Sequence, residues 1–226
     1  MPNYKIADVV WSICPKQSYT QDLLREYETA ESGAEVIVPA FSKGSESEHI
    51  QLLQYINEQL AGNYRGLMIH GAAIVYDQKA YLFVALPGTG KTTHISLWRQ
   101  VMGENVCILN GDKPFLRDKD NQILVYGGPW RGKEGFGCNA VYPLGGIYLL
   151  HRGKENRVCK ASSREKLRGL LDAILLCADH RAMLNVMAVL NTLCKSVPVS
   201  VLYCNMETDA VTTVLRHMEE GAACEN

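Results

Sequence analysis

The sequence lacks the features that would assign it to a membrane or to nucleic acid. No apolar run approaches the roughly 20 residues of a membrane-spanning helix, and Met1–Ile6 does not have the basic and then apolar layout of a signal peptide. The formal net charge is −1 and lysine and arginine form no run, whereas nucleic-acid-binding proteins present a clustered basic surface. We therefore expect a cytoplasmic protein that binds neither membranes nor nucleic acid.

Paired cysteines are missing as well. The eight cysteines include no Cys-x-x-Cys pair, and most lie in apolar runs such as Ala173–Cys177. We interpret them as small buried residues in a reducing compartment. A structural zinc site or a disulfide framework is the less favoured alternative, because the spacing supports neither.

A glycine-rich stretch stands out among the features that are present. Residues 85–93 read Ala-Leu-Pro-Gly-Thr-Gly-Lys-Thr-Thr, follow the apolar run Ala80–Val84 and lead into the helix-like segment His94–Met102. A strand, a glycine-rich turn and a helix start surround one point with backbone N–H groups and a positive helix end, which is how proteins bind phosphate. The stretch therefore predicts a nucleotide-phosphate site.

Each residue type in this stretch suits that task. Gly88 and Gly90 permit a close backbone approach, the Lys91 ammonium would reach the terminal phosphates, and the Thr92 hydroxyl would bind magnesium. Two departures, Ala85 in place of glycine and a proline without an N–H donor, keep open the alternative of an ordinary turn with an incidental lysine. The predicted nucleotide-binding residues are Pro87, Gly88, Thr89, Gly90, Lys91, Thr92 and Thr93.

The rest of the chain predicts one α/β domain with a mixed sheet. The hairpin of 67–76 with 80–84 is its unusual feature, because the strand before a phosphate loop normally has a parallel partner. Apolar spacing predicts further strands over 4–11 and 35–39 (at an edge of the sheet), 105–109, 146–150 and 198–203, and a second hairpin of 114–117 with 123–126. It also predicts helices over 46–61 (capped by Ser45–Glu48 and ended by Gly62), 162–177, 182–195 and 208–220 (stopped at Gly221).

Two further residues are candidates for chemistry. Asp112 ends a buried strand at Asn110–Asp112, after the helix of the phosphate loop, so it could hold a metal ion or act as a base; Asn-Gly-Asp is also ordinary turn chemistry. His70 lies in an apolar strand, where a lone histidine is more often a hydrogen-bonded core residue, yet its pKa range suits a proton carrier.

The segment 127–137 has five glycines in eleven residues and no periodicity, so it is predicted to be a loop. Arg131 and Lys133 are flanked there by glycines and by Trp130, and they could close over phosphates or an acceptor as a lid. A solvated surface loop is the alternative. Packed, surface or helix-start positions are expected for His94, Arg152, His180 and Arg181.

The chain contains, in this order, His70-Gly, the hairpin, Pro87–Thr93, Asp112, the glycine-rich loop and the closing strand and helix. This order resembles that of the catalytic domain of HPr kinase/phosphorylase, over roughly residues 50–220. The loop itself is similar to that of the ATP-dependent phosphoenolpyruvate carboxykinases. The length of 226 residues predicts a single domain over 1–226, in which 1–45 form edge strands and a lead-in and 46–220 form the catalytic core. The resemblance also implies a homo-oligomer.

The resemblance further implies roles for individual residues. Lys91 would contact the β- and γ-phosphates, Thr92 would bind magnesium, Asp112 would serve metal or base, and His70 would lie beside the transferred phosphoryl group. Where the family has two adjacent aspartates, this chain has glycine followed by Asp112, so one carboxylate occupies the position.

The expected function is that of an ATP- and magnesium-dependent kinase that transfers the γ-phosphoryl group to a hydroxyl of a peptide, protein or small molecule. Its expected catalytic residues are Asp112, His70, Lys91, Arg131 and Lys133, the last two neutralising charge. One alternative is an ATP-binding regulatory module without efficient transfer. Another is a phosphate-releasing or decarboxylating enzyme, for which no dedicated metal-ligand set is evident.

Overall fold

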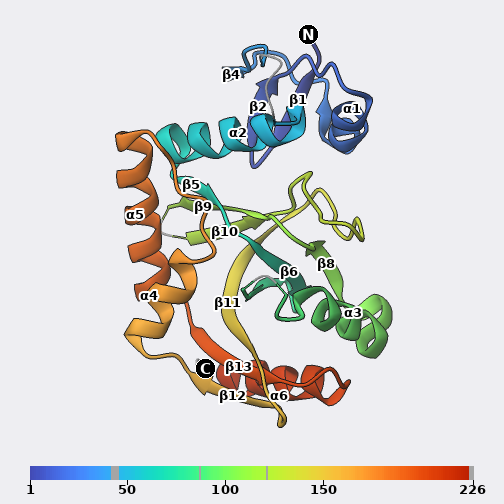
Figure 1. Cartoon of the computed structure of the whole chain (residues 1–226), viewed down its shortest axis with the longest axis vertical. Coiled ribbons are helices and arrows are strands. Elements are labelled where there is room, and N and C mark those ends of the chain that lie inside the picture. The colour runs from blue at the N-terminus through green and yellow to red at the C-terminus, as the bar shows by residue number, and fades with distance from the viewer. Residues whose placement is uncertain (42–45, 87, 121, 224–226) are drawn as a thin grey trace.

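The computed structural model describes residues 1–41, 46–86, 88–120 and 122–223 (Figure 1). It is a mixed α/β structure with two sheets in the described part of the chain. The smaller sheet contains β1 (Asn3–Ile6), β2 (Val9–Ser12), β3 (Glu28–Thr29) and β4 (Val36–Ile37) in the order β3-β1-β2-β4. It lies at the N-terminal end of the molecule beside α1 (Ser18–Leu24) (Figure 1).

The smaller sheet corrects two expectations for the N-terminal region. The single strand expected over 4–11 is a hairpin, because Ala7 and Asp8 adopt φ values of 52° and 57°, the left-handed pair of a tight hairpin turn. The strands expected at an edge of the main sheet instead form their own sheet, in which β4 pairs in parallel with β2. The hydrophobic alternation predicted strands here but not their partners.

The main sheet contains nine strands among the described residues. They are β5 (Gly66–Met68), β6 (Gly71–Tyr76), β7 (Lys79–Val84), β8 (Cys107–Asn110), β9 (Phe115–Lys119), β10 (Gln122–Tyr126), β11 (Val141–Arg152), β12 (Arg157–Lys160) and β13 (Val199–Cys204). The order is β5-β9-β10-β11-β7-β6-β8, with β13 beside β11 and β12 beside β13. Both predicted hairpins, β6–β7 and β9–β10, are confirmed.

The strand directions bring four strand ends to one edge of the sheet. β7 and β13 each run parallel to β11, whereas β6 runs antiparallel to both β7 and β8. The carboxyl ends of β7, β8, β11 and β13 therefore meet at the same edge. Ligands of open α/β sheets bind at such an edge.

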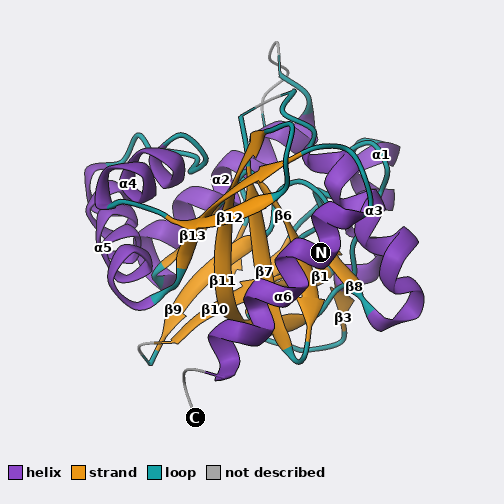
Figure 2. Ribbon diagram, turned by 90° about the horizontal axis from the view of Figure 1, so that it is seen from below, coloured by secondary structure: helices purple, strands orange, loops and turns teal. Residues whose placement is uncertain are grey.

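Helices cover both faces of the main sheet (Figure 2). α4 (Ser163–Leu171) and α5 (His180–Ser196) lie on one side and α3 (Lys91–Met102) on the other. The strand β7 shows why both faces are covered: Leu82 and Val84 pack into the cluster that includes α4 and α5, while Phe83 between them packs into the cluster that includes α3 and α6 (Asp209–Ala223). Successive strand side chains point to opposite faces.

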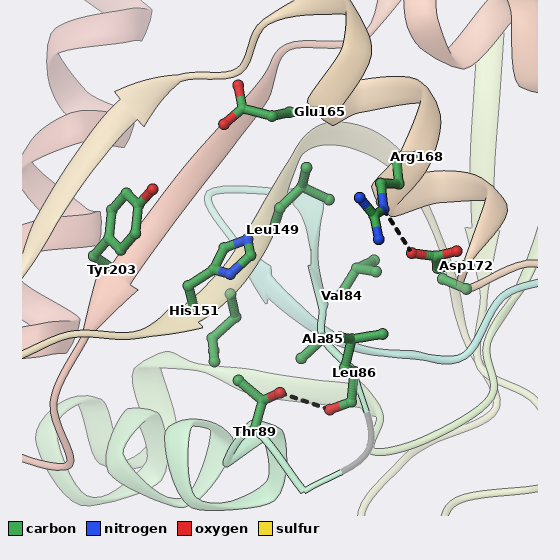
Figure 3. Close-up of a pocket in the computed structure, with 13 residues that line it drawn as sticks. Val84, Ala85, Leu86, Thr89, Leu149, His151, Glu165, Arg168, Asp172 and Tyr203 are labelled. Atoms are coloured by element: carbon green, nitrogen blue, oxygen red, sulfur yellow. Dashed lines mark hydrogen bonds and ion pairs between the residues drawn. The ribbon is translucent and has the colours of Figure 1, made fainter.

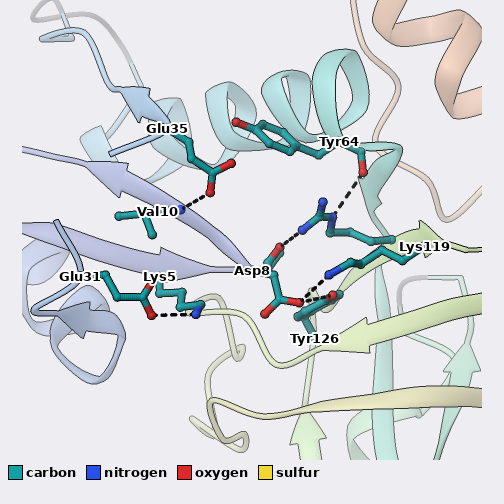
Figure 4. Close-up of polar contacts among 10 residues, drawn as sticks. Lys5, Asp8, Val10, Glu31, Glu35, Tyr64, Lys119 and Tyr126 are labelled. Carbon is teal, nitrogen blue, oxygen red and sulfur yellow. Dashed lines mark hydrogen bonds and ion pairs between the residues drawn. The ribbon is translucent and has the colours of Figure 1, made fainter. Parts of the chain in front are cut away.

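A third hydrophobic cluster joins the N-terminal sheet to the main sheet through α2 (Glu48–Tyr64). Polar contacts at the β1–β2 turn reinforce it (Figure 4). The Asp8 carboxylate accepts hydrogen bonds from the Tyr126 hydroxyl at 2.8 Å and from Lys119 at 3.2 Å, and the Arg117 guanidinium donates to the Ala7 carbonyl at 2.7 Å. The N-terminal sheet is thus docked on the β9–β10 hairpin.

Several predicted boundaries are wrong, and tertiary contacts explain the largest error. The helix expected over 162–177 ends at Leu171, because Ile174 bridges to Ile69 and the Leu175 N–H donates to Met68. Gly62 lies inside α2, which ends at Tyr64 and is capped by Arg65 in a left-handed conformation (φ 48°). The α6 helix runs past Gly221, β12 was not predicted, and Ser45 lies outside the described residues.

Cysteine burial was also predicted wrongly for three positions. Cys177 and Cys204 are buried, but Cys14, Cys107 and Cys159 are exposed, the latter two on strands at the margin of the main sheet. Cys224 lies outside the described residues. Within the described chain, no helix has both the length and the apolar character needed to cross a membrane.

Candidate functional site

The glycine-rich loop connects the carboxyl end of β7 to the start of α3. Gly88 and Gly90 have φ values of +77° and +112°, a region that side-chain-bearing residues rarely adopt. A Cβ at either position would meet nothing within 4 Å, so the backbone conformation rather than crowding calls for glycine. Pro87 lies outside the described residues.

Three side-chain hydrogen bonds hold the loop in place. The Thr89 hydroxyl donates to the Leu86 carbonyl at 2.8 Å. The Arg152 guanidinium, at the end of β11, donates to the carbonyls of Gly88 at 2.6 Å and Thr89 at 3.1 Å. Arg152 was expected to be a surface residue; it is exposed, but it also ties the loop to the neighbouring strand.

Lys91, Thr92 and Thr93 form the first turn of α3, where the unpaired N–H groups and the helix dipole favour an anion. The Thr92 side chain is exposed and that of Lys91 is partly buried. Burial lowers the pKa of Lys91; the nearby Asp112 carboxylate opposes this effect and the Lys113 ammonium adds to it. The three charged groups therefore share one electrostatic environment.

Asp112 is the centre of a polar cluster at the same edge. His70 Nε2 lies 3.1 Å from Asp112 Oδ1, and the Lys113 ammonium donates to Oδ2. Burial alone would raise the pKa of Asp112, but the hydrogen bonds from His70 and Lys113 outweigh it and hold the pKa of the carboxyl well below its usual range. Asp112 is accordingly an anion at neutral pH.

The position of His70 differs from the expected one. The strand predicted over 67–76 is interrupted between β5 and β6, and His70 lies in the gap. The backbone N–H of His70 donates to the backbone carbonyl of Ala173 at 2.7 Å, and the backbone N–H of Gly71 donates to the backbone carbonyl of Asp112 at 2.9 Å. The interruption places the imidazole at the sheet edge and not within a core strand.

Asn110 is a positioning residue that the sequence did not reveal. It is fully buried, its amide donates to the Gly128 carbonyl at 2.9 Å, and its Oδ1 accepts the N–H groups of Asp112 at 2.9 Å and Lys113 at 2.8 Å. It therefore fixes the backbone that carries both charged residues. The signal was present in Asn-Gly-Asp, since asparagine commonly bonds the backbone two residues on.

The predicted loop over 127–137 folds back on this cluster. The Gly111 N–H donates to the Phe136 carbonyl at 2.9 Å, and a Cβ on Gly132 would lie 3.1 Å from that of Asp112. Trp130 is buried, and its indole N–H donates to the His49 carbonyl at 3.1 Å. The loop is thus anchored between Asp112 and α2.

The two predicted cations of the loop have different surroundings. The Arg131 guanidinium pairs with the Glu26 carboxylate at 2.5 Å and donates to the Tyr27 hydroxyl at 3.2 Å. Lys133 is exposed. Both line, together with Asp112, a cavity of about 410 Å³ between the loop and α1. A second cavity, of about 320 Å³, is lined by Ala85, Leu86 and Thr89 of the glycine-rich loop, and the two cavities share no lining residue.

The remaining candidates are where the sequence placed them. His94 is buried against Phe83 and accepts the Trp98 indole N–H at 3.1 Å. His180 and Arg181 are exposed at the start of α5.

No protein-family model matches the sequence, and no curated protein matches it. Among solved structures, the fold is similar to that of the Hpr(Ser) kinase/phosphatase from Coxiella burnetii, with 12% sequence identity and a TM-score of 0.40 over 70% of this chain and 96% of that chain.

Proposed function

We propose that the protein is an ATP- and magnesium-dependent kinase that transfers the γ-phosphoryl group to a hydroxyl of a peptide, protein or small molecule. One observation carries the proposal: the glycine-rich loop, Lys91 on the first turn of α3, and the Asp112 cluster share one edge of the sheet. Phosphoryl transfer depends almost entirely on positioning and on neutralising charge around the γ-phosphate, and these groups are suited to both.

The phosphates would bind to the loop and to the N-terminus of α3. Backbone N–H groups there, together with the side chains of Lys91, Thr92 and Thr93, would surround the β- and γ-phosphates. Lys91 is partly buried and so less screened by water. Its charge would oppose the negative charge that builds up on the phosphoryl oxygens.

Thr92 and Asp112 would hold magnesium, because a hydroxyl and an ionised carboxylate are the oxygen donors that this ion prefers. The lowered pKa of Asp112 keeps that carboxylate ionised and thus suited to a cation. When bound, magnesium supplies positive charge that helps to neutralise the phosphates.

Asp112 would also accept the proton of the attacking hydroxyl. An oxygen with a lowered pKa is a weak base, but phosphoryl transfer passes through a loose transition state in which little proton abstraction is needed early. His70 would orient the carboxylate and lie beside the transferred group. Lys133 would neutralise charge from the loop, and Arg131, held by Glu26, would keep the loop in position.

Equilibrium binding tests the nucleotide half of the proposal. Wild-type protein should bind ATP in the presence of magnesium by isothermal titration calorimetry, and Lys91→Met should weaken binding by tenfold or more, about 1.4 kcal/mol. Lys154→Met, at an exposed position in the turn after β11, is the matched control and should bind as the wild type does. Equal affinity of wild type and Lys91→Met would contradict the assigned site.

A regulatory module that binds ATP without efficient transfer is a second candidate. It is favoured by one observation: a single carboxylate, shared between His70 and Lys113, stands where the resembled family has two. A module of this kind would bind ATP with the same dependence on Lys91 but would form no ADP with any acceptor.

A further inference from the structure

The smaller of these two cavities, which residues of the glycine-rich loop line, has no role in the proposal so far (Figure 3). Ala85, Leu86 and Thr89 of the loop form one wall, and α4 forms the opposite wall. The ends of β7, β11 and β13 form its floor. Its volume of about 320 Å³ lies at the lower end of the range for small-molecule sites, roughly 300–1,000 Å³.

The geometry of phosphoryl transfer assigns the two cavities to different ligands. The attacking and leaving oxygens lie roughly in line through the transferred phosphorus, so the acceptor and the nucleoside diphosphate must approach from opposite sides. Asp112, the proposed base, lines only the larger cavity. The acceptor therefore belongs in the larger cavity, and the smaller one remains for the nucleoside.

The chemistry of the smaller cavity suits an aromatic base and a ribose. Its floor is apolar, and the rings of His151 and Tyr203 lie at one side with centroids 5.6 Å apart and an angle of 31°. Flat apolar surfaces of this kind pack against aromatic rings. Arg157 lies over the Tyr203 ring at 4.4 Å and holds it in place.

Polar groups stand opposite the aromatic pair. Figure 3 shows Arg168 and Asp172 on the side of the cavity away from Tyr203. Their 3.8 Å separation is longer than a hydrogen bond; the Arg168 side chain is largely exposed and that of Asp172 about half exposed. They can therefore form hydrogen bonds with the edge of a base or with ribose hydroxyls.

We infer that the cavity between the glycine-rich loop and α4 binds the nucleoside half of the nucleoside triphosphate. The inference rests on the proposed function, because it needs the triphosphate to lie at the start of α3. Arg152 connects the two subsites, since it follows His151 on β11 and donates to the loop carbonyls of Gly88 and Thr89.

Comparing ATP with inorganic tripolyphosphate separates the nucleoside subsite from the phosphate subsite. Both ligands, with magnesium, are titrated into wild type, Leu86→Ala, Arg168→Ala and Tyr203→Leu. Each variant should weaken ATP by about fivefold or more and leave tripolyphosphate within about twofold of wild type. Leu86 and Arg168 are exposed, so these two variants fold even where Tyr203→Leu does not. Arg164→Ala, on the same helix but outside the cavity, should change neither affinity.

The outcomes are distinct. Variants that weaken both ligands equally, or neither, overturn the nucleoside assignment while leaving the phosphate site standing. Wild-type protein that binds neither ATP nor tripolyphosphate overturns the proposed function and the inference together.

Discussion

His70 Nε2 lies 3.1 Å from Asp112 Oδ1, although the two residues belong to separate segments, one between β5 and β6 and the other after β8. The contact orients the carboxylate and favours its charged form. A lone histidine in an apolar run thereby acquires a specific partner at the sheet edge. The pair is the part of the site on which proton acceptance would depend.

Removing the imidazole should move the pH profile of transfer. His70→Ala removes a hydrogen bond that lowers the pKa of Asp112, so that pKa rises and the acid limb of the rate profile shifts to higher pH. His70→Gln retains a donor and should restore much of the wild-type profile. The measurement is kcat/KM against pH for all three proteins. Identical acid limbs in wild type and His70→Ala would show that the contact does not tune the carboxylate.

The left-handed glycine before α3 should not tolerate a side chain. Gly90→Ala places a Cβ at φ +112° and should cost about 1–3 kcal/mol, with a matching loss of ATP affinity. Gly62→Ala is a control with the opposite expected effect. Gly62 lies inside α2, and a Cβ there would meet its nearest neighbour at 4.0 Å. Because glycine is unfavourable inside a helix, this variant should raise the free energy of unfolding by about 0.5–1 kcal/mol.

Denaturant unfolding and ATP titration measure both effects. An ATP affinity unchanged by Gly90→Ala would argue against a phosphate-binding loop.

Substitutions of Arg131 and Lys133 should have different effects on stability and on phosphoryl transfer. Arg131→Met leaves Glu26 and Tyr27 without their partner, so it should lower the melting temperature and transfer together. Glu26→Gln should lower the melting temperature by a smaller amount. Its effect on the free energy of unfolding should be roughly 1 kcal/mol or less, because the Glu26 carboxylate is mostly exposed. Lys133→Met should reduce transfer without a thermal effect.

Thermal melts run beside transfer assays distinguish these cases. If Arg131→Met melted like the wild type yet lost transfer, its guanidinium would have to act on the substrate directly.

Buried His94 should make stability depend on pH. Burial lowers the pKa of His94 to about 4 in the folded state, whereas the pKa in the unfolded state is about 6.5. The free energy of unfolding is therefore unaffected by His94 above pH 6.5 and decreases as the pH falls toward 4, because the unfolded chain then binds the proton more readily. At pH 5 the loss amounts to about 2 kcal/mol, at about 1.4 kcal/mol per pH unit. His94→Gln retains an acceptor for the Trp98 indole and should flatten this dependence.

The free energy of unfolding at pH 7 and pH 5 provides the test. His180→Gln, at an exposed position, should follow the wild-type dependence; a slope shared by all three proteins would remove His94 as its source.

Local sequence signals predicted the parts of the site that are contiguous in the chain. The strand, glycine loop and helix from Ala80 to Met102 were readable because each glycine and the apolar spacing report local backbone conformation. Both hairpins were readable for the same reason, since turn residues such as Asp77 and Gln78 take left-handed conformations.

Contacts between distant segments could not be read in this way. The contact of Arg131 with Glu26 was not predicted, because Glu26 lies in an N-terminal segment whose packing no local pattern specifies. The helix expected beyond Leu171 is replaced by pairing of Ile174 with Ile69, where a tertiary contact outweighs helical spacing. The separate N-terminal sheet was missed likewise, because alternation predicts a strand and not its neighbour.

The most direct test of the kinase proposal is acceptor-dependent formation of ADP from ATP and magnesium, screened against pooled hydroxyl metabolites and peptides. The proposal predicts that at least one pool stimulates ADP formation, that Asp112→Asn lowers the stimulated rate by about 10²-fold or more, and that this variant still binds ATP. Asp120→Asn, in the exposed β9–β10 turn, should act like the wild type. Tight ATP binding with no ADP formed in any pool would contradict a kinase and favour the regulatory module.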